Sequence, residues 1–167
     1  MADPIRPPGY NSVTVDNDDL FNDVVDNIVV LLENAKLLGT IKVSEIYKYD
    51  NSHVTSFPSV VVVWQGPSTE QIRTMGRVYT HQTDVSVVIY YYHAEAMDEM
   101  ARRELATAAH KLADVIRTHR NCNGFSNIGM SISSITPVNR VFEDRVVKAV
   151  KIEVTVPIDR RVSQATL

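Results

Sequence analysis

The sequence predicts an α+β fold, in which two amphipathic helices pack on one face of a mainly antiparallel β-sheet. Two segments carry apolar residues at helical spacing, and five shorter segments carry the apolar runs or the alternation typical of strands. The first three strands and the last two are each close enough in sequence to form hairpins. The elements therefore follow the order α-β-β-β-α-β-β, and 167 residues are enough for one domain with its own core.

The first helix is predicted to begin near residue 18, where the apolar residues take up helical spacing. Residues 16–19 read Asp-Asn-Asp-Asp, which supplies an N-cap and favourable charge, and Gly39 is well placed to end the helix. Residues 1–16 are rich in proline and poor in large apolar groups, so we expect an extended N-terminal arm. The predicted single domain then spans residues 17–161.

Four segments follow the first helix. Residues 41–49 and 59–66 are predicted strands, and the second is apolar on both faces, as a central strand would be. Residues 66–76 are bounded by glycines and carry little periodicity, so they are predicted to form an exposed loop. Residues 77–93 alternate and are predicted to form a long strand that ends in three tyrosines and a histidine.

This long strand is too long for one compact domain. If residues 78–92 are continuous, they span about 50 Å, whereas a chain of this length has a diameter near 40 Å. The strand should therefore overhang or bend, and an overhanging edge needs protection, for example by a neighbouring subunit. Tyrosine suits interfaces, so Tyr90 and Tyr92 are predicted subunit-interface residues; the alternative is that such rings close the core under a helix end.

The second half of the chain contains the remaining helix and two strands. Residues 95–120 form an amphipathic helix by their apolar stripe, which "NCNG" at 121–124 ends. Residues 128–138 and 145–161 are predicted strands, joined by a turn or bulge at 139–144, and residues 162–167 form a polar tail. The expected apolar stripe of the helix consists of Met97, Met100, Leu105, Ala108, Leu112, Val115 and Ile116.

The sequence predicts no catalytic residue, no metal site and no cofactor site. The five histidines lack ligand spacing, Cys122 has no evident base partner, and phosphate-binding or dinucleotide glycine motifs are absent. A cluster of His93, Glu95, Asp98 and Glu99 could be imagined as a magnesium site or an acid–base pair. These acids also complement the dipole of the second helix, which is the simpler interpretation.

Composition and charge favour a cytoplasmic protein that is not a general nucleic-acid coat. The formal net charge is −3, the single cysteine cannot form an internal disulfide, and no secretion signal or membrane-spanning run is evident. The first 35 residues carry seven acids against Arg6, whereas basic residues, including Arg160 and Arg161, gather near the end. Complementary patches of this kind suit head-to-tail contacts between identical subunits, although solvated faces explain them equally well. Arg160 and Arg161 are therefore further predicted interface residues.

The organisation of residues 18–161 resembles the tail terminator, or tail completion, proteins of long-tailed bacteriophages. The resemblance lies in the order of the elements and in their residue patterns. These are a first helix, "FPSVVVVW", a loop, the strand ending "VVIYYYH", a helix beginning "EAMDEMARRELATAAHKL", and the final "VVKAVKIEVTVPIDRR". This family has no short diagnostic motif and no catalytic signature. The resemblance implies a structural virion protein rather than an enzyme.

The resemblance also implies the partners. Six copies would form a ring that caps the head-proximal end of the tail tube, stops its polymerisation and meets the head connector, with DNA passing through without sequence-specific binding. Assembly would take place in the host cytoplasm, and an acidic lumen would let DNA slide. The N-terminal arm and the 66–76 segment are the expected contacts with tube or connector; the residues named for this role are Ser68, Glu70, Gln71 and Arg73.

Other functions remain open at this point. The nearest alternative is another neck or tube component, such as a head-closure protein or a tube subunit, which would stack without end. A host-cell binding module of similar fold is another. A small metal-dependent hydrolase using His93 and the acids at 95–99 is a more distant one.

Overall fold

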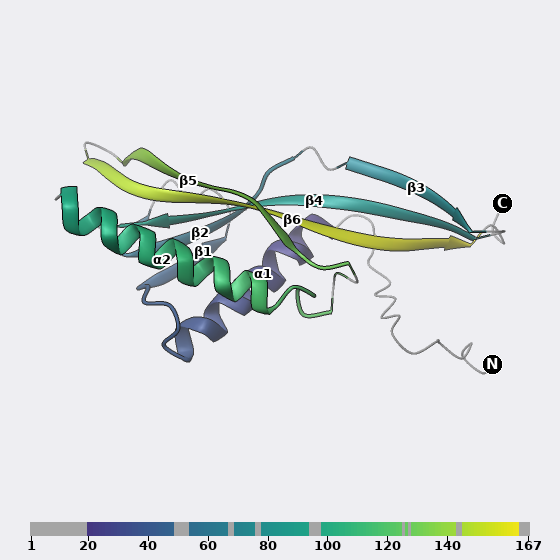
Figure 1. Cartoon of the computed structure of the whole chain (residues 1–167), viewed down its shortest axis with the longest axis horizontal. Helices are drawn as coiled ribbons and strands as arrows, with labels where there is room; N and C mark the ends of the chain where they lie inside the picture. The colour runs from purple at the N-terminus through teal and green to yellow at the C-terminus, as the bar shows by residue number, and fades with distance from the viewer. Residues whose placement is uncertain are drawn as a thin grey trace.

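The computed structural model confirms the α+β fold class (Figure 1). The described residues are 20–48, 54–66, 69–75, 78–93, 98–124, 126, 128–142 and 145–163. Within them, two helices and six strands follow in the order α1 (Leu20–Leu37), β1 (Glu45–Lys48), β2 (Ser59–Trp64), β3 (Thr69–Met75), β4 (Val78–Tyr92), α2 (Asp98–Thr118), β5 (Ser131–Phe142) and β6 (Arg145–Ser163). All the expected elements are present, with β3 as an addition.

Helix α1 forms where its apolar spacing predicts. Val24, Ile28 and Leu32 recur every four residues and are fully buried against the sheet. Gly39 ends the helix in the left-handed region, with φ of 73°, and the next backbone N–H, of Thr40, donates to the carbonyl of Ala35 at 2.9 Å. The predicted cap at residues 16–19 lies outside the described residues, as does the N-terminal arm.

Helix α2 buries Leu105, Leu112 and Ile116 as predicted. Met100 does not belong to the buried stripe, because 72% of its surface is exposed at the start of the helix, beyond the core. The predicted break after the helix is confirmed by a turn in which Cys122 and Asn123 both adopt positive φ. Neither α1 nor α2, the helices of the described chain, is long and apolar enough to cross a membrane.

The sheet has the strand order β1-β2-β4-β6-β5, with β3 pairing to β4 beside this path. All neighbours are antiparallel except β1 and β2, which are parallel, so the expected hairpin between the first two strands is wrong. The connection crosses the sheet instead of reversing beside it. Val54 and Phe57 pack against the face opposite the helices, which carries the chain over that face before β2 begins.

Several strand bounds differ from the predicted ones. β1 is only four residues long, because Ile41 and Val43 enter the core from the connection after α1 rather than from a strand. β5 extends to Phe142 and pairs with β6 up to Arg145, so the predicted turn at 139–144 is mostly strand. The irregular pairing lies elsewhere, between Ile132 and Ser134.

The two faces of the sheet carry different layers. Helices α1 and α2 cover one face (Figure 1), and the main core lies between them and alternate residues of β4 and β6, including Ile89, Tyr91, Ile152 and Val154. On the opposite face, which we call the back face, a smaller cluster forms around Val61, Tyr92 and Ala149. Tyr91 therefore packs in the main core, whereas Tyr92 packs in the cluster on the back face.

β4 is a continuous strand of 15 residues, and it overhangs the helical layer as predicted. Its second half pairs with β2 from Val87 to Tyr92, whereas its first half, from Val78 to Asp84, pairs with β3. β6 runs along the other side of the whole strand. The overhang is thus a three-stranded arm that projects from the body (Figure 1), and the chain itself protects both edges of β4.

Candidate interaction surfaces

The back face carries an aromatic cluster at the body end of β4. The Tyr92 ring meets Phe142 edge-on, with 4.9 Å between ring centroids, and stacks nearly parallel to Tyr90 at 5.9 Å. The guanidinium carbon of Arg140 lies 4.4 Å from the centroid of the Tyr90 ring, a cation–π contact. Tyr92 is 1% exposed, and Tyr90 is half-buried.

This cluster separates the two predicted interface tyrosines. Tyr92 is buried within its own chain, so it contributes to folding, which was the alternative interpretation. Tyr90 keeps an accessible edge and remains a predicted interface residue. Arg160 and Arg161 lie in the arm, where their backbones pair with His81 and Thr80 of β4. The cluster itself was not predicted, because Phe57 and Phe142 are distant in sequence and only the β1–β2 crossing brings them together.

The predicted contact segment is a strand rather than a loop. Glu70, Gln71 and Arg73 belong to β3 and pair with Thr83, Gln82 and Thr80 respectively, whereas Ser68 lies outside the described residues. The loop prediction is wrong because it was made from the lack of apolar alternation. A strand shows such alternation only where one of its faces is buried. β3 lies in the arm, away from the helical layer, so an alternating apolar pattern is not required of its residues.

A short polar network crosses the back face beside the aromatic cluster. Lys151 and Glu153 of β6 form an ion pair, and the Ser134 hydroxyl of β5 donates to Glu153 at 2.7 Å. The hydrogen bond between the pair raises the pKa of Lys151, and the hydrogen bonds from Lys151 and Ser134 lower the pKa of Glu153. Both side chains therefore stay charged at neutral pH.

A cavity of about 510 Å³ lies between α2 and the segment that follows α1. His93, at the end of β4, contacts the Glu104 carboxylate of α2 here and is 8% exposed. Burial, with a smaller contribution from the charge of Glu104, raises the pKa of Tyr91. The contact joins the end of β4 to α2.

The partner that the structure gives His93 was not in the cluster imagined around it. Glu104 lies eleven residues along the chain, nearly two turns into α2. The sequence indicates this contact only weakly, because Glu104 is an acidic residue that directly precedes the buried Leu105 on the helix. Glu95 lies outside the described residues, and the side chains of Asp98 and Glu99 are not described.

Three other reactive side chains among the described residues make contacts within the chain. Cys122 is buried, and burial raises the pKa of its thiol to about 12, so it is protonated at neutral pH. His110 lies 3.4 Å from the Asp114 carboxylate, and Nδ1 of His119 lies 3.0 Å from the carbonyl of Val115. Across the described ranges, no group of three or more His, Cys, Asp or Glu side chains is placed to hold a metal ion.

Comparison with known proteins assigns no family to the chain. The sequence matches no protein family model and no curated protein. A functional conclusion therefore depends on the chain's own surfaces, together with the resemblance in element order set out above.

Proposed function

We propose that this chain is a tail terminator protein of a long-tailed bacteriophage. Six copies form a ring that caps the head-proximal end of the tail tube, stops its polymerisation and joins it to the head connector. The observation that carries the proposal is the three-stranded arm formed by β3, the first half of β4 and the last part of β6. An arm projecting from a helix-covered body suits contact with other protein subunits.

The construction of the arm supports this role. Its central strand is continuous with the body sheet through Val85 and Val87, which are fully buried in the main core. β6 is continuous in the same way through Val156 and Ile158. The arm is therefore fixed relative to the body, and in a ring it would hold Glu70, Gln71 and Arg73 at a defined position toward tube or connector.

Charge supports passage of DNA through such a ring. The net charge is −3 and the acids concentrate in the first 35 residues, of which Asp23, Asp26 and Glu33 lie on α1. Asp26 is paired with Lys48 at 2.7 Å, which leaves Asp23 and Glu33 as the stronger candidates for a repulsive lumen or for subunit contacts. A surface that repels phosphate lets DNA slide rather than bind. The finished ring belongs to the virion, and its assembly to the host cytoplasm.

Binding to purified tails tests the function itself. The chain, labelled with a visible tag, is added to tail tubes that lack their terminator and is imaged by electron microscopy. We expect label at one end of each tube and an end to further growth. Label along the tube would instead indicate a tube subunit, and no label at tube ends would contradict the proposal. Reversing the charges of Glu70 and Arg73 should weaken end binding if β3 makes the contact.

A further inference from the structure

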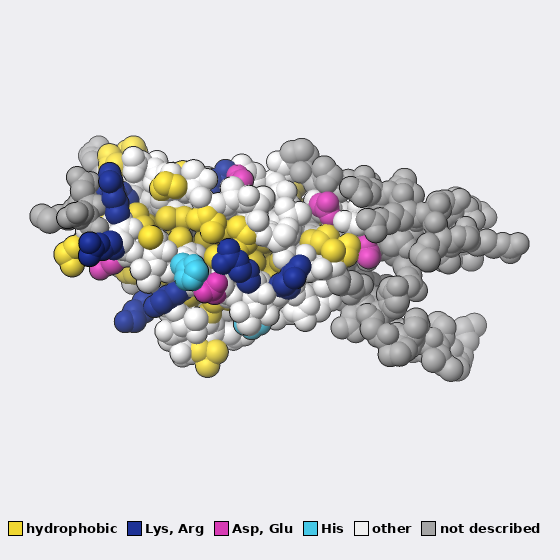
Figure 2. All heavy atoms as spheres, viewed as in Figure 1, with side chains coloured by type: hydrophobic (Ala, Val, Ile, Leu, Met, Phe, Trp, Pro, Cys, Tyr) yellow, Lys and Arg dark blue, Asp and Glu magenta, His cyan; other side chains and the backbone are white. Residues whose placement is uncertain are grey.

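A groove runs between α2 and the β5–β6 hairpin on the helix-covered side of the sheet. It has a volume of about 910 Å³, and its floor is apolar, formed by Leu105, Ala109, Pro137 and Val150. Figure 2 shows the hydrophobic side chains gathered between these elements. Ile135 lines the groove and is 42% exposed. Apolar surface left open in this way is typical of a contact with another molecule.

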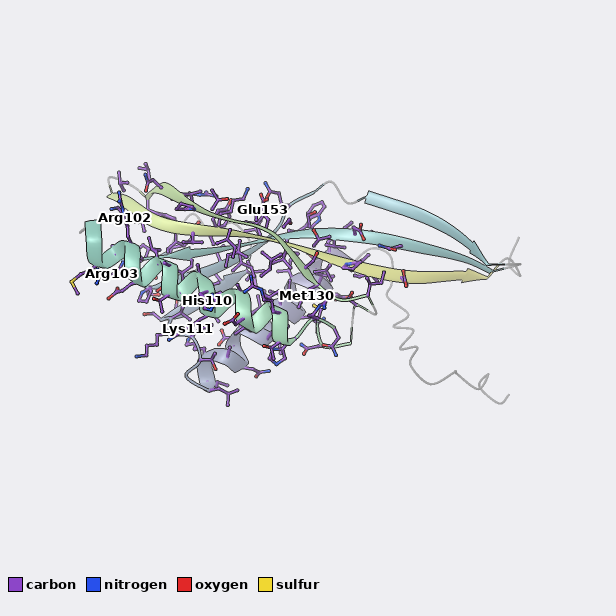
Figure 3. The ribbon with its side chains drawn as sticks, viewed as in Figure 1. Arg102, Arg103, His110, Lys111, Met130 and Glu153 are labelled. Atoms are coloured by element: carbon purple, nitrogen blue, oxygen red, sulfur yellow. The ribbon has the colours of Figure 1, made fainter. Side chains whose placement is uncertain are left out.

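The walls of the groove carry two cationic side chains. Arg102 lies on α2, as does His110 (Figure 3), and Lys148 lies on the facing stretch of β6. Among the described residues that line the groove, none is acidic. The chemistry of the groove therefore selects an apolar occupant that carries negative charge at its flank.

The end of α1 presents a surface of this kind, which we call the α1 ridge. Leu37 and Leu38 are 83% and 82% exposed, and Val30 is 49% exposed. Val30 and Leu37 are seven residues apart, so they lie on one face of the helix, and Glu33 lies between them on that face. Two adjacent leucines exposed to this degree contribute little buried surface to the fold of a single chain.

The α1 ridge and the groove lie at different sides of the molecule. α1 packs over β1 and β2, whereas α2 packs over β5 and β6, and β1 and β5 are the two edges of the body sheet. In Figure 1, α1 ends at the bottom of the view and β5 lies at the top, with α2 between them. One copy cannot fill its own groove with its own ridge, but a second copy can.

We propose that the α1 ridge of one copy inserts into the α2–β5 groove of the next, with Glu33 facing Arg102 and Lys148. Each copy then offers one ridge and one groove, so the contact is head-to-tail and continues around a closed ring. The inference names the subunit contact of the ring in the proposed function and rests on that function. The contact is separate from the arm, which stays available for tube or connector.

Cysteine cross-linking between two differently substituted chains tests this contact. Leu38→Cys and Ile135→Cys chains are prepared separately and mixed under mild oxidation; both positions are exposed, and native Cys122 is buried. A disulfide-linked dimer is expected from the mixture and from neither chain alone. Ser133→Cys is the matched control, because it is exposed on the same strand outside the groove lining and should not link to Leu38→Cys.

Substitution of the ridge gives a second readout. Leu38→Asp removes an exposed side chain and should leave the thermal midpoint of the monomer unchanged, while weakening assembly by about tenfold or more. Glu33→Lys should weaken assembly as well, and Arg102→Glu in the same chain should restore it. If Glu33→Lys weakened assembly only by misfolding, a second charge reversal would not restore assembly.

The outcomes separate this inference from the proposed function. A wild-type ring that forms without the cross-link, and that Leu38→Asp leaves intact, overturns the ridge-and-groove contact while the terminator function stands. A cross-link from Leu38→Cys alone indicates a two-fold contact and also overturns it. A chain that stays monomeric without a cross-link overturns the inference too, and tail-end binding then decides the function independently.

Discussion

Replacing Tyr92 by alanine tests whether the end of β4 serves folding or assembly. Tyr92 is 1% exposed, and its ring meets both Phe142 and Tyr90. A buried aromatic residue removes about 150 Å² or more from water, which at about 25 cal/mol per Å² corresponds to roughly 4 kcal/mol. The ring contacts add about 1 kcal/mol. We therefore expect Tyr92→Ala to lower the free energy of unfolding by about 4 to 5 kcal/mol, near the top of the range for such truncations.

Urea unfolding followed by tryptophan fluorescence measures this loss. The midpoint should shift with little change in the dependence on urea, because the surface exposed on unfolding is nearly the same. Tyr90→Ala is the matched control: its side chain is half-buried, so we expect a loss of about 1 to 2 kcal/mol. Any further effect of Tyr90→Ala should appear in assembly instead.

A loss below about 1.5 kcal/mol for Tyr92→Ala would refute the assignment of this ring to the core. If the same variant also failed to assemble, Tyr92 would have to contact a neighbouring subunit, which requires a different conformation at the end of β4. Both measurements should be made at a concentration at which native mass shows a single species.

Three further results are expected. Burial raises the pKa of the Cys122 thiol from its usual value near 9 to about 12, so roughly 4 kcal/mol of stability that is present below pH 9 is lost as the pH rises to 12. Cys122→Ala should therefore reduce the fall in the free energy of unfolding between pH 9 and pH 12, and an unchanged fall would contradict the raised pKa. Gly39→Ala should cost about 1 to 2 kcal/mol in urea unfolding, because φ is 73° while no atom crowds the added methyl group; no loss would mean that the turn adjusts freely. Deleting residues 1–14 should leave the number of subunits in the ring unchanged but reduce joining of tails to heads, counted by electron microscopy; normal joining would count against a contact role for the N-terminal arm.

The helices and the central strands could be predicted because their side chains face one core. Val24, Ile28 and Leu32 mark α1 by spacing alone, and Ile152 and Val154 mark the buried face of β6 by alternation. The length of β4 correctly predicted an overhang. These features follow from burial, which leaves a periodic signal in the sequence.

Elements without a buried face were harder to predict. β3 pairs through its backbone in the arm, so the composition of Thr69–Met75 carries no apolar period. The parallel pairing of β1 with β2 depends on Val54 and Phe57 crossing the back face, which is a tertiary contact. Local sequence could not distinguish this crossing from a hairpin turn.

The interaction surfaces were predicted only in part. The tyrosines at the end of β4 were singled out, but their alternation assigned Tyr92 to a buried cluster with Phe142, fifty residues further along the chain. The α1 ridge was not predicted: helical spacing placed Leu38 on the apolar stripe of the first helix, whereas it is 82% exposed in the structure. The exposure of Leu37 and Leu38 becomes visible only once the helix has ended at Gly39 and the core is known to lie elsewhere.

Native mass spectrometry with negative-stain imaging, over a concentration series of the wild-type chain, is the measurement to make. The ring proposal predicts a closed hexamer near 110 kDa, six times the 18.7 kDa chain, with a central opening. Open filaments would contradict a ring that ends polymerisation and would indicate a tube subunit. A single monomeric species at every concentration would contradict self-assembly through the chain's own surfaces.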